Sequence, residues 1–301
     1  MLFAVKEYDL AATLASGQVF RWRRIKGDAW EGVLGDHWFR LRQSAAGLDV
    51  EAVTDRPRWD RVHHFLGLDD DLAAIRQTFP VDAPMQMAVQ ACPGLRLLRQ
   101  DPWECTASFI LSSTKQIVQI QQCAELLAER FGEPVAVPAG HAPAYSFPSM
   151  KRLAGVAEAE LRSCKLGFRA RYLSVTARIL NEDASYLNTL ARLPTVQARE
   201  ALMRLPGIGR KIADCVLLFA YGRQDAFPVD VWVLRALRSL YFPGKKPSSR
   251  TLEHFTANHF GPYAGYAQQY LFHYFRTCLG RTESKPLLIP QAGRTAGKRV
   301  S

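Results

Sequence analysis

Lys211 and Asp230 are the two side chains of this 301-residue chain whose types and surroundings best fit covalent chemistry. A lysine amine becomes a nucleophile when it loses its proton, and burial near the positive end of a helix favours the neutral form. A nearby carboxylate can stabilise positive charge that develops on a reacting group. Each residue also has an ordinary alternative role: Lys211 as a surface lysine that binds phosphate, and Asp230 as the N-cap of a helix that begins at Val231.

A glycine-rich turn over residues 205–209 precedes both residues, and we expect it to join two helices. The first helix is predicted to start with Thr195 as its N-cap and to end near Arg204. Apolar residues recur at helical spacing after the turn, which predicts a second helix that begins at Lys211 and that Gly222 ends.

The start of this second helix has the features of an anion site, because its first N–H groups have no partner within the helix. Gly207 and Gly209 allow close approach to the backbone, and Arg210 adds positive charge. An ordinary corner between two helices is the alternative. The full Leu-Pro-Gly-Ile-Gly-x-Lys string is much more specific than Gly-x-Gly alone.

The composition favours a polyanionic partner, since 39 Lys and Arg face 28 Asp and Glu, giving a formal net charge of +11. The six cysteines lie at long, irregular spacings without a Cys-x-x-Cys pair, which argues against zinc and against an iron–sulfur cluster. Scattered thiols predict an intracellular protein. No apolar run reaches the length of about 18 residues that would predict a membrane span.

The hydrophobic pattern changes along the chain. Residues 1 to about 50 are predicted to form strands, residues 57 to 90 are helical in pattern, and from Pro102 onward the chain is predicted to be almost wholly helical.

The segment Leu205–Cys215, together with Val229–Val231, closely resembles the helix–hairpin–helix and Gly/Pro-Asp loop of base-excision DNA glycosylases. The resemblance is to 8-oxoguanine DNA glycosylases of the eukaryotic-like type and covers roughly residues 5 to 280. Further matching segments occur in the same order: Ser16–Trp22, Leu97–Cys105, Leu166–Tyr172 and Gly261–Gln268.

The resemblance implies an α+β fold in which a small antiparallel sheet packs on a mostly helical body of two subdomains. We expect an N-terminal sheet domain over residues 1–95 and a helical glycosylase domain over residues 96–282, with the helix–hairpin–helix at about 196–222. Residues 283–301 are predicted to be a flexible basic tail that adds non-specific DNA affinity, or a solvated tail with no role.

The resemblance also assigns the chemistry. Neutral Lys211 attacks C1′ of a nucleotide that has been flipped out of the duplex, expels the base and forms a Schiff base, and β-elimination then nicks the strand. Asp230 stabilises the positive charge on the sugar. Relatives that lack this lysine use water and do not nick, so Lys211 predicts a bifunctional enzyme.

The base pocket is assigned in the same way. Gln268 binds the Watson–Crick edge of the flipped base, Phe272 stacks on its plane, and Cys215 covers the other side; out of context Phe272 would be a core aromatic. The Gly17 carbonyl accepts the proton that 8-oxoguanine carries on N7, where guanine instead offers an acceptor. Gly17 is therefore predicted to discriminate the lesion from guanine.

Other members of the family also contact the duplex through a wedge and a turn. Phe168 and Arg169 resemble a wedge that enters the duplex and contacts the orphaned cytosine, with a core Phe beside a surface Arg as the alternative. The backbone carbonyls of the turn are a possible monovalent-cation site beside a DNA phosphate, formed by Met203, Leu205 and Ile208.

Three departures from the family pattern bear on DNA contacts. Thr114 lies in a segment where relatives carry an asparagine run that fills the vacated stack. Gln119 stands where many relatives have an arginine that reads the opposing cytosine, so weaker cytosine preference is expected. Trp232 replaces a histidine that supports the lesion phosphate, and an indole offers one donor and no charge.

The leading hypothesis is therefore a bifunctional 8-oxoguanine DNA glycosylase and AP lyase that acts on double-stranded DNA as a monomer and needs no cofactor. Two alternatives stay open: a glycosylase of the same fold for alkylated or other damaged purines, and a non-catalytic helix–hairpin–helix protein that only grips DNA. Gly17, Gln268 and Lys211 argue against the first, and the presence of both Lys211 and Asp230 argues against the second.

Overall fold

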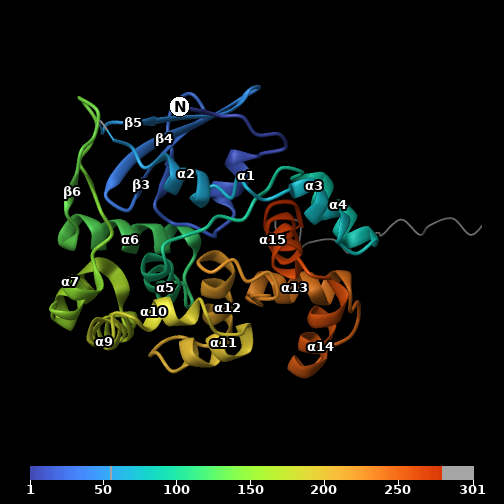
Figure 1. Cartoon of the computed structure of the whole chain (residues 1–301). Helices are drawn as coiled ribbons and strands as arrows, with labels where there is room; N and C mark the ends of the chain where they lie inside the picture. Colours follow the sequence, from blue (N-terminus) through green and yellow to red (C-terminus); the bar gives the residue numbers. More distant parts are fainter. Residues whose placement is uncertain (55, 280–301) are drawn as a thin grey trace, which may run out of the picture.

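An antiparallel sheet forms one layer of the molecule and lies over a helical body (Figure 1). The computed structural model describes residues 1–54 and 56–279. Within the first range the sheet has the strand order β1-β5-β4-β3-β2. Its strands are β1 (Leu2–Phe3), β2 (Trp22–Arg24), β3 (Ala29–Leu34), β4 (His37–Ser44) and β5 (Gly47–Ala52).

Aromatic and aliphatic side chains of the strands build a core of their own beneath the sheet. Trp22 stacks on Phe65 of helix α2 (Trp59–Phe65), with ring centroids 5.4 Å apart. Gly32 is paired directly opposite Trp22, and a Cβ at this position would collide with the indole. The close approach of ring to backbone therefore requires glycine here.

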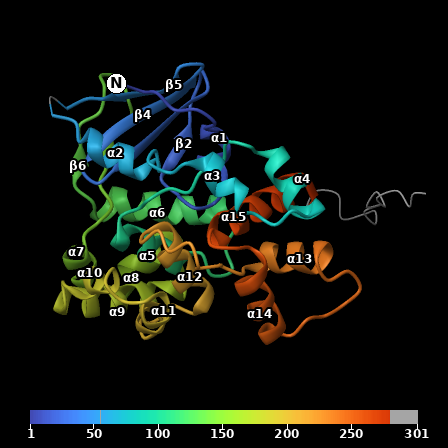
Figure 2. The same ribbon diagram turned by 45° about the vertical axis from the view of Figure 1, so that its right-hand side comes forward.

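The rest of the described chain is mostly helical, which confirms the predicted α+β class. The layered arrangement persists when the molecule is turned by 45° (Figure 2). The remaining elements before the hairpin are α3 (Leu72–Gln77), α4 (Ala83–Ala91), α5 (Pro102–Leu111), α6 (Ile117–Phe131), α7 (Met150–Ala154), α8 (Glu158–Leu161), the π-helical turn η1 (Arg162–Leu166), α9 (Arg169–Glu182) and α10 (Tyr186–Leu190). After them come α11 (Thr195–Met203), α12 (Arg210–Phe219), α13 (Val231–Leu240), α14 (Ser249–His259), α15 (Ala264–Tyr274) and the π-helical turn η2 (Phe275–Leu279).

Two segments differ from the predicted pattern. Residues 1–50 were expected to be strands, but they include helix α1 (Leu10–Ala15), whose first turn is capped by the Asp9 carboxylate at 2.8 Å from Ala12 N. The chain after Pro102 was expected to be almost wholly helical, but β6 (Pro134–Val135) and β7 (Ala144–Tyr145) form a hairpin between α6 and α7. Prolines in this segment cannot continue a helix.

The β6–β7 hairpin rises from the helical body alongside the sheet (Figure 1). His141, in its connecting loop, lies with Nε2 3.2 Å from a carboxylate oxygen of Glu31 on β3. Val33 and Trp38 of the sheet pack against Val135 of the hairpin. The hairpin therefore ties the helical body to the sheet.

The predicted hairpin of two helices is present as α11 and α12, with small differences at its ends. Pro194 occupies the N-cap position, so Thr195 is the first residue of α11 and not its cap, and its hydroxyl donates to Asp225 at 2.9 Å. The first helix ends at Met203 with Arg204 as C-cap, close to the expected position. The second begins one residue early, at Arg210, and ends at Phe219 before Gly222 is reached.

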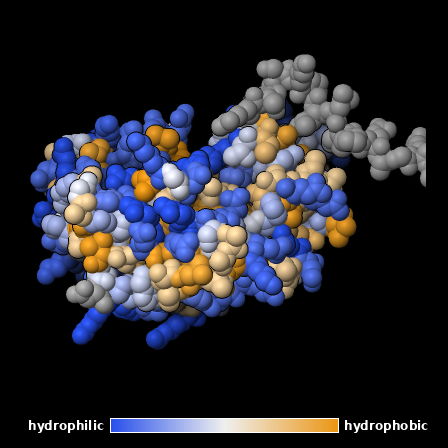
Figure 3. Space-filling model, turned by 90° about the horizontal axis from the view of Figure 1, so that it is seen from above, coloured by the Kyte–Doolittle hydropathy of each residue, from blue (hydrophilic) through white to orange (hydrophobic). Residues whose placement is uncertain are grey.

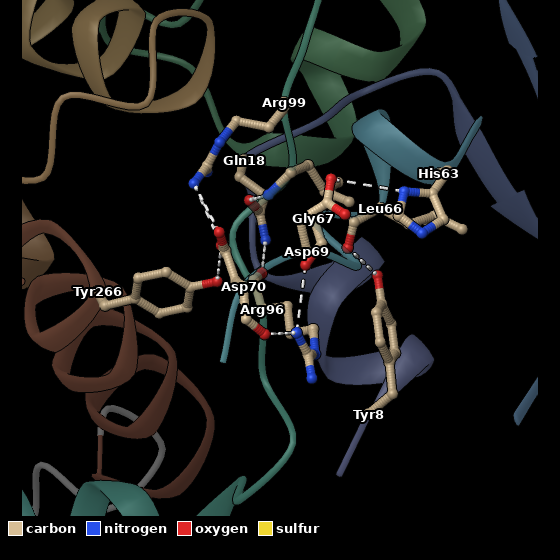
Figure 4. Close-up of polar contacts among 11 residues, drawn as sticks. Tyr8, Gln18, His63, Leu66, Gly67, Asp69, Asp70, Arg96, Arg99 and Tyr266 are labelled. Carbon is tan, nitrogen blue, oxygen red and sulfur yellow. Dashed lines mark hydrogen bonds and ion pairs between the residues drawn. The ribbon is translucent and has the colours of Figure 1, made fainter. Parts of the chain in front are cut away.

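Asp70 joins three parts of the chain that are distant in sequence (Figure 4). One of its carboxylate oxygens accepts a hydrogen bond from the Tyr266 hydroxyl of α15 at 2.6 Å and from Arg99 Nη2 at 3.1 Å. The guanidinium of the buried Arg96 binds the Asp70 carbonyl at 2.7 Å. These bonds fix α15 against the N-terminal part of the chain.

The surface seen from the sheet side is largely hydrophilic, with small separate hydrophobic patches (Figure 3). None of the helices within residues 1–54 and 56–279 combines the length and apolar character needed to cross a bilayer. The basic tail predicted over residues 283–301 lies outside the described residues.

Candidate active site

A small cavity lies where the start of α12, the segment before α13, helix α15 and the loop after α1 meet. Its volume is about 40 Å³, which has room for water. The cavity is lined by Gly17, Phe109, Lys211, Cys215, Phe219, Pro228, Asp230, Gln268, Gln269 and Phe272.

The two residues singled out for covalent chemistry thus share one cavity with all four predicted base-pocket residues. They come from widely separated parts of the sequence. Three elements contribute them: the α1–β2 loop, the hairpin with the segment that follows it, and α15.

Lys211 lies in the first turn of α12, and its side chain is partly buried. Its Nζ donates to Ser112 Oγ at 3.2 Å and lies 5.3 Å from the ring centroid of Phe109, both contributed by the end of α5. No carboxylate among the described residues forms an ion pair with this amine. The amine is therefore oriented by a neutral hydroxyl and an aromatic face.

Asp230 is the N-cap of α13, as one of its two predicted roles required. Its Oδ1 accepts a hydrogen bond from Val233 N at 2.8 Å. Burial raises the pKa of Asp230 above the usual range, while the backbone N–H of Val233 and the charge of Lys211 oppose this shift. Asp230 thus caps α13 and lines the cavity at the same time.

Cys215 lies one turn after Lys211 on α12. Burial raises the pKa of its thiol to about 12, although the nearby Lys211 charge opposes the shift. The side chain is thus an uncharged thiol at neutral pH. Cys215 therefore contributes an apolar wall to the cavity that also holds Lys211.

Gln268 and Phe272 lie four residues apart on α15 and share a face of the helix. Gln268 is buried, and its Oε1 has no hydrogen-bond partner within the described residues. A buried acceptor without a donor costs free energy unless a ligand supplies one. The amide is therefore suited to bind a donor that enters the cavity, such as the Watson–Crick edge of a purine.

The loop after α1 brings backbone to the opposite side of the cavity. Gly17 has a φ of +76°, and a Cβ there would lie 2.7 Å from Ile117 Cδ1 and 3.5 Å from Phe272 Cε1. The positive φ favours glycine here, and an added Cβ would also press on the end of the Ile117 side chain.

The start of α12 is suited to bind an anion. Gly209 is the N-cap and supplies no side chain to the first N–H groups, which stay available for phosphate. Arg210 is half exposed and lies 3.3 Å from Glu253. Gly207, with a φ of +80°, packs against Tyr172 of α9, so the turn of the hairpin rests on that helix.

Comparison with known proteins fits this geometry. Residues 1–106 match the N-terminal domain of 8-oxoguanine DNA glycosylase, and residues 107–260 match the helix–hairpin–helix Gly/Pro-Asp superfamily of base excision DNA repair proteins. The chain belongs to this superfamily.

Individual relatives align over nearly the whole chain. A probable N-glycosylase/DNA lyase of Methanothermobacter thermautotrophicus is 31% identical over 92% of this chain and 96% of its own. An N-glycosylase/DNA lyase of Arabidopsis thaliana is 30% identical over 88% of this chain and 77% of its own. A Clostridium acetobutylicum 8-oxoguanine glycosylase/lyase, solved with double-stranded DNA carrying cytosine opposite the lesion, has a TM-score of 0.85 at 29% identity, over 90% of this chain and 93% of that one.

The two residues of the predicted wedge differ in exposure in this member of the superfamily. Phe168 is 50% exposed, whereas Arg169 is 5% exposed. The Arg169 guanidinium lies 4.3 Å from the Phe168 ring centroid and donates to the Ser113 carbonyl and to Thr114 Oγ1. Contact between Arg169 and an orphaned base stays a prediction, and it would require the guanidinium to leave these partners.

The three departures from the family pattern have local roles in the structure. Thr114 has a φ of +56° and accepts from Arg169. The Gln119 side chain accepts from Gln116 N at 3.0 Å and so caps α6. Arg235 lies over the Trp232 ring, with its Cζ 5.4 Å from the centroid.

The predicted cation site is formed by backbone oxygens in the turn after α11. The Leu205 carbonyl accepts from Ile208 N at 3.2 Å, which leaves one of its lone pairs for a cation. The carbonyls of Met203 and Ile208 complete the predicted set, which stays a prediction. In the described part of the chain, no group of three or more His, Cys, Asp or Glu side chains could hold a metal ion.

Sequence reasoning missed two kinds of residue at this site. Ser112 binds the Lys211 amine, although the segment that contains it was noted only as a departure from the family. Gln269 also lines the cavity, and it binds the Ser16 carbonyl at 2.9 Å. Its position directly after Gln268 was the only sequence signal, because a bond to a distant backbone carbonyl leaves no pattern.

Proposed function

We propose that this chain excises 8-oxoguanine from duplex DNA with Lys211 as nucleophile and then nicks the strand as an AP lyase. The observation that carries the proposal is the small cavity, where Lys211, Asp230 and the unpartnered amide oxygen of Gln268 meet. An amine, a carboxylate and a base-edge acceptor are the groups that a bifunctional glycosylase needs. Backbone binding alone needs none of them inside a cavity.

The first step breaks the glycosidic bond of a nucleotide flipped out of the duplex. The neutral amine of Lys211 forms a bond to C1′ as the bond from C1′ to the base breaks, and the departing base takes up a proton. The carboxylate of Asp230 stabilises the positive charge on the sugar while both bonds are partial.

The second step nicks the DNA. The sugar ring opens to give a protonated Schiff base between C1′ and Lys211, which makes the C2′ hydrogen acidic. Loss of that proton expels the 3′ phosphate, so the strand is cut on the 3′ side of the lesion. Hydrolysis of the remaining Schiff base returns the lysine.

Recognition is divided among the other cavity residues. Gln268 binds the Watson–Crick edge, Phe272 and Cys215 enclose the base, and the Gly17 carbonyl accepts the N7 proton of 8-oxoguanine. Guanine has an acceptor at N7, and two acceptors facing each other in a buried site cost about 1–3 kcal/mol.

We assign DNA contacts outside the cavity to the hairpin and the wedge. Phosphate would bind the N–H groups near Gly207 and Gly209, with Arg210 and Trp232 beside it. Phe168 would fill the space that the flipped nucleotide vacates. Gln119 lacks the charge of an arginine, so the preference for an opposing cytosine should be weak.

The test is single-turnover cleavage of duplexes with one 8-oxoguanine opposite each of the four bases, with borohydride to trap the Schiff base. Wild type should excise, nick and give a trapped adduct, and Lys211→Gln should lose the adduct and the nick. Lys151→Gln, which removes the same charge from an exposed site on α7, should behave as wild type. Absence of excision by the wild type would overturn the assignment to 8-oxoguanine.

A further inference from the structure

The loop that carries Gly17 into the cavity is held by its backbone carbonyls. Three of the four carbonyls from residue 15 to residue 18 accept a hydrogen bond from a distant side chain: Ala15 from Arg276 Nη2 at 2.6 Å, Ser16 from Gln269 Nε2 at 2.9 Å, and Gln18 from Gln100 Nε2 at 2.6 Å. Among residues 1–54 and 56–279, no group donates to the fourth carbonyl, that of Gly17. The acceptor assigned to the lesion is thus the one that the protein leaves open.

The side chains that hold the loop are removed from water. Gln18, Gln100 and Gln269 are 0%, 9% and 2% exposed. The Gln18 amide itself donates to the Arg96 carbonyl at 2.8 Å (Figure 4) and accepts from Leu98 N at 2.8 Å. Buried bonds of this kind are hard to exchange for water, so they restrict the loop strongly.

Because peptide groups are planar, these hydrogen bonds also restrict the direction of the Gly17 carbonyl. The Ser16 carbonyl lies in the peptide plane before Gly17, and the Gln18 carbonyl lies in the plane after residue 18. Four torsions lie between these planes, φ and ψ of Gly17 and φ and ψ of Gln18. Ile117 and Phe272 lie beside Gly17, and the buried hydrogen bonds of the Gln18 amide restrain the second residue. When both flanking planes are held, the plane of the Gly17 carbonyl has little freedom left.

We infer that Gln269 is a positioning residue for lesion recognition. By holding the Ser16 carbonyl it directs the Gly17 carbonyl toward the N7 proton of the bound base, and so it sets the preference for 8-oxoguanine over guanine. This inference rests on the proposed function.

The position of Gln269 on α15 gives it this influence. It follows Gln268 directly, and the same helix carries Phe272 one turn later. The helix that binds the edge and the face of the base therefore also holds the loop that reads N7. A flipped base meets the three contacts as one rigid unit.

The experiment compares two substrates that differ at one atom. Duplexes carry, opposite cytosine, either 8-oxoguanine or 8-oxo-7-deazaguanine, in which a methylene group replaces N7–H. Wild type should excise 8-oxoguanine faster in single turnover. Gln269→Met keeps the length of the side chain but removes the donor, and it should reduce this preference by about tenfold or more.

Nicking of a duplex with a preformed abasic site is the internal reference, because no base is present for Gly17 to read. It should be unchanged in Gln269→Met. Tyr266→Phe is the matched control on the same helix: it removes the bond to Asp70 without touching the loop, and it should keep the wild-type preference. Gln100→Met releases the other flank of Gly17 and should repeat the effect of Gln269→Met, even if one of the two variants fails to fold.

Each contrary outcome has a separate meaning. If a folded Gln269→Met keeps the wild-type preference, or loses excision and abasic nicking in proportion, Gln269 does not position the carbonyl and the inference is wrong. If wild type excises neither damaged base, the proposed function itself is wrong.

Discussion

Asp230 caps a helix in the structure, and in the proposed function it also stabilises a cation. The cap holds one carboxylate oxygen against Val233 N, and Asp230 also lines the cavity. Asparagine is also a good N-cap but carries no charge. The two functions can therefore be separated by one substitution.

We predict that Asp230→Asn keeps the stability of the wild type to within about 1 kcal/mol, because the cap survives. Excision should fall by about 10² or more, because the sugar cation loses its counter-charge. Urea unfolding and single-turnover excision measure the two effects. Asp230→Ala should lose both stability and excision. If the Asn and Ala variants were equally destabilised, asparagine would not keep the cap.

The pKa of Asp230 adds a pH dependence to the same prediction. In the proposed mechanism the ionised form of Asp230 is the active one, so excision should decline as the pH falls through the pKa of this group. Burial raises that pKa, so the decline should occur at higher pH than the value of about 3.9 for an exposed aspartate. The residual activity of Asp230→Asn should lack this limb of the profile.

At the scale of elements, α9 packs against the hairpin, and in the proposed function the two support the DNA together. Tyr172 packs on Gly207, and the Thr176 hydroxyl donates to the Pro206 carbonyl at 3.1 Å. The exposed Phe168 lies immediately before the first residue of α9. The proposed wedge and the proposed phosphate site are thus connected by a single helix.

We predict that Gly207→Ala weakens both the proposed wedge and the proposed phosphate site. Its φ of +80° disfavours alanine, and the new Cβ would lie 2.7 Å from Tyr172 Cβ. We expect a loss of about 1–3 kcal/mol in the free energy of unfolding and weaker binding to undamaged duplex. Gly140→Ala is the control, because Gly140 has a φ of +79° but nothing within 4 Å of an added Cβ. Equal losses in the two variants would show that the contact with Tyr172 is unimportant.

The elements differ in how far the sequence predicts them. Helix α12 has a continuous apolar periodicity, and its start was predicted to within one residue. The short α1 carries a capping aspartate, but the β-like residues around it outweighed that signal. Strands β6 and β7 have two residues each, which is too short for any periodicity. The predicted domain boundary near residue 95 stays a prediction.

The residues of the site also differ in how far the sequence predicts them. The six proposed catalytic and pocket residues could be predicted from motifs, because the proposed role of each is a direct contact with the nucleotide. Gln100 and Gln269 could not, because they act on backbone carbonyls that are far away in sequence. Arg169 was expected to contact the duplex. Its guanidinium is instead buried and donates to the Ser113 carbonyl, a contact that no sequence pattern predicts.

At the scale of the whole molecule, Asp70 connects the N-terminal part of the chain to α15. We predict that Asp70→Ala costs about 1–3 kcal/mol in the free energy of unfolding, because the buried Tyr266 hydroxyl loses its acceptor. Thermal or urea unfolding measures the loss. Asp69→Ala removes an adjacent, exposed carboxylate and should change stability little; a similar cost for both would place the effect in the local loop.

The buried cysteines have a consequence for the conditions in which such an enzyme works. Cys92, Cys105, Cys123, Cys164 and Cys215 are buried, and burial raises the pKa of each thiol. Peroxides attack the thiolate and hardly touch the protonated thiol. We therefore expect Cys215, which lines the proposed base cavity, to react slowly with the oxidants that turn guanine into 8-oxoguanine.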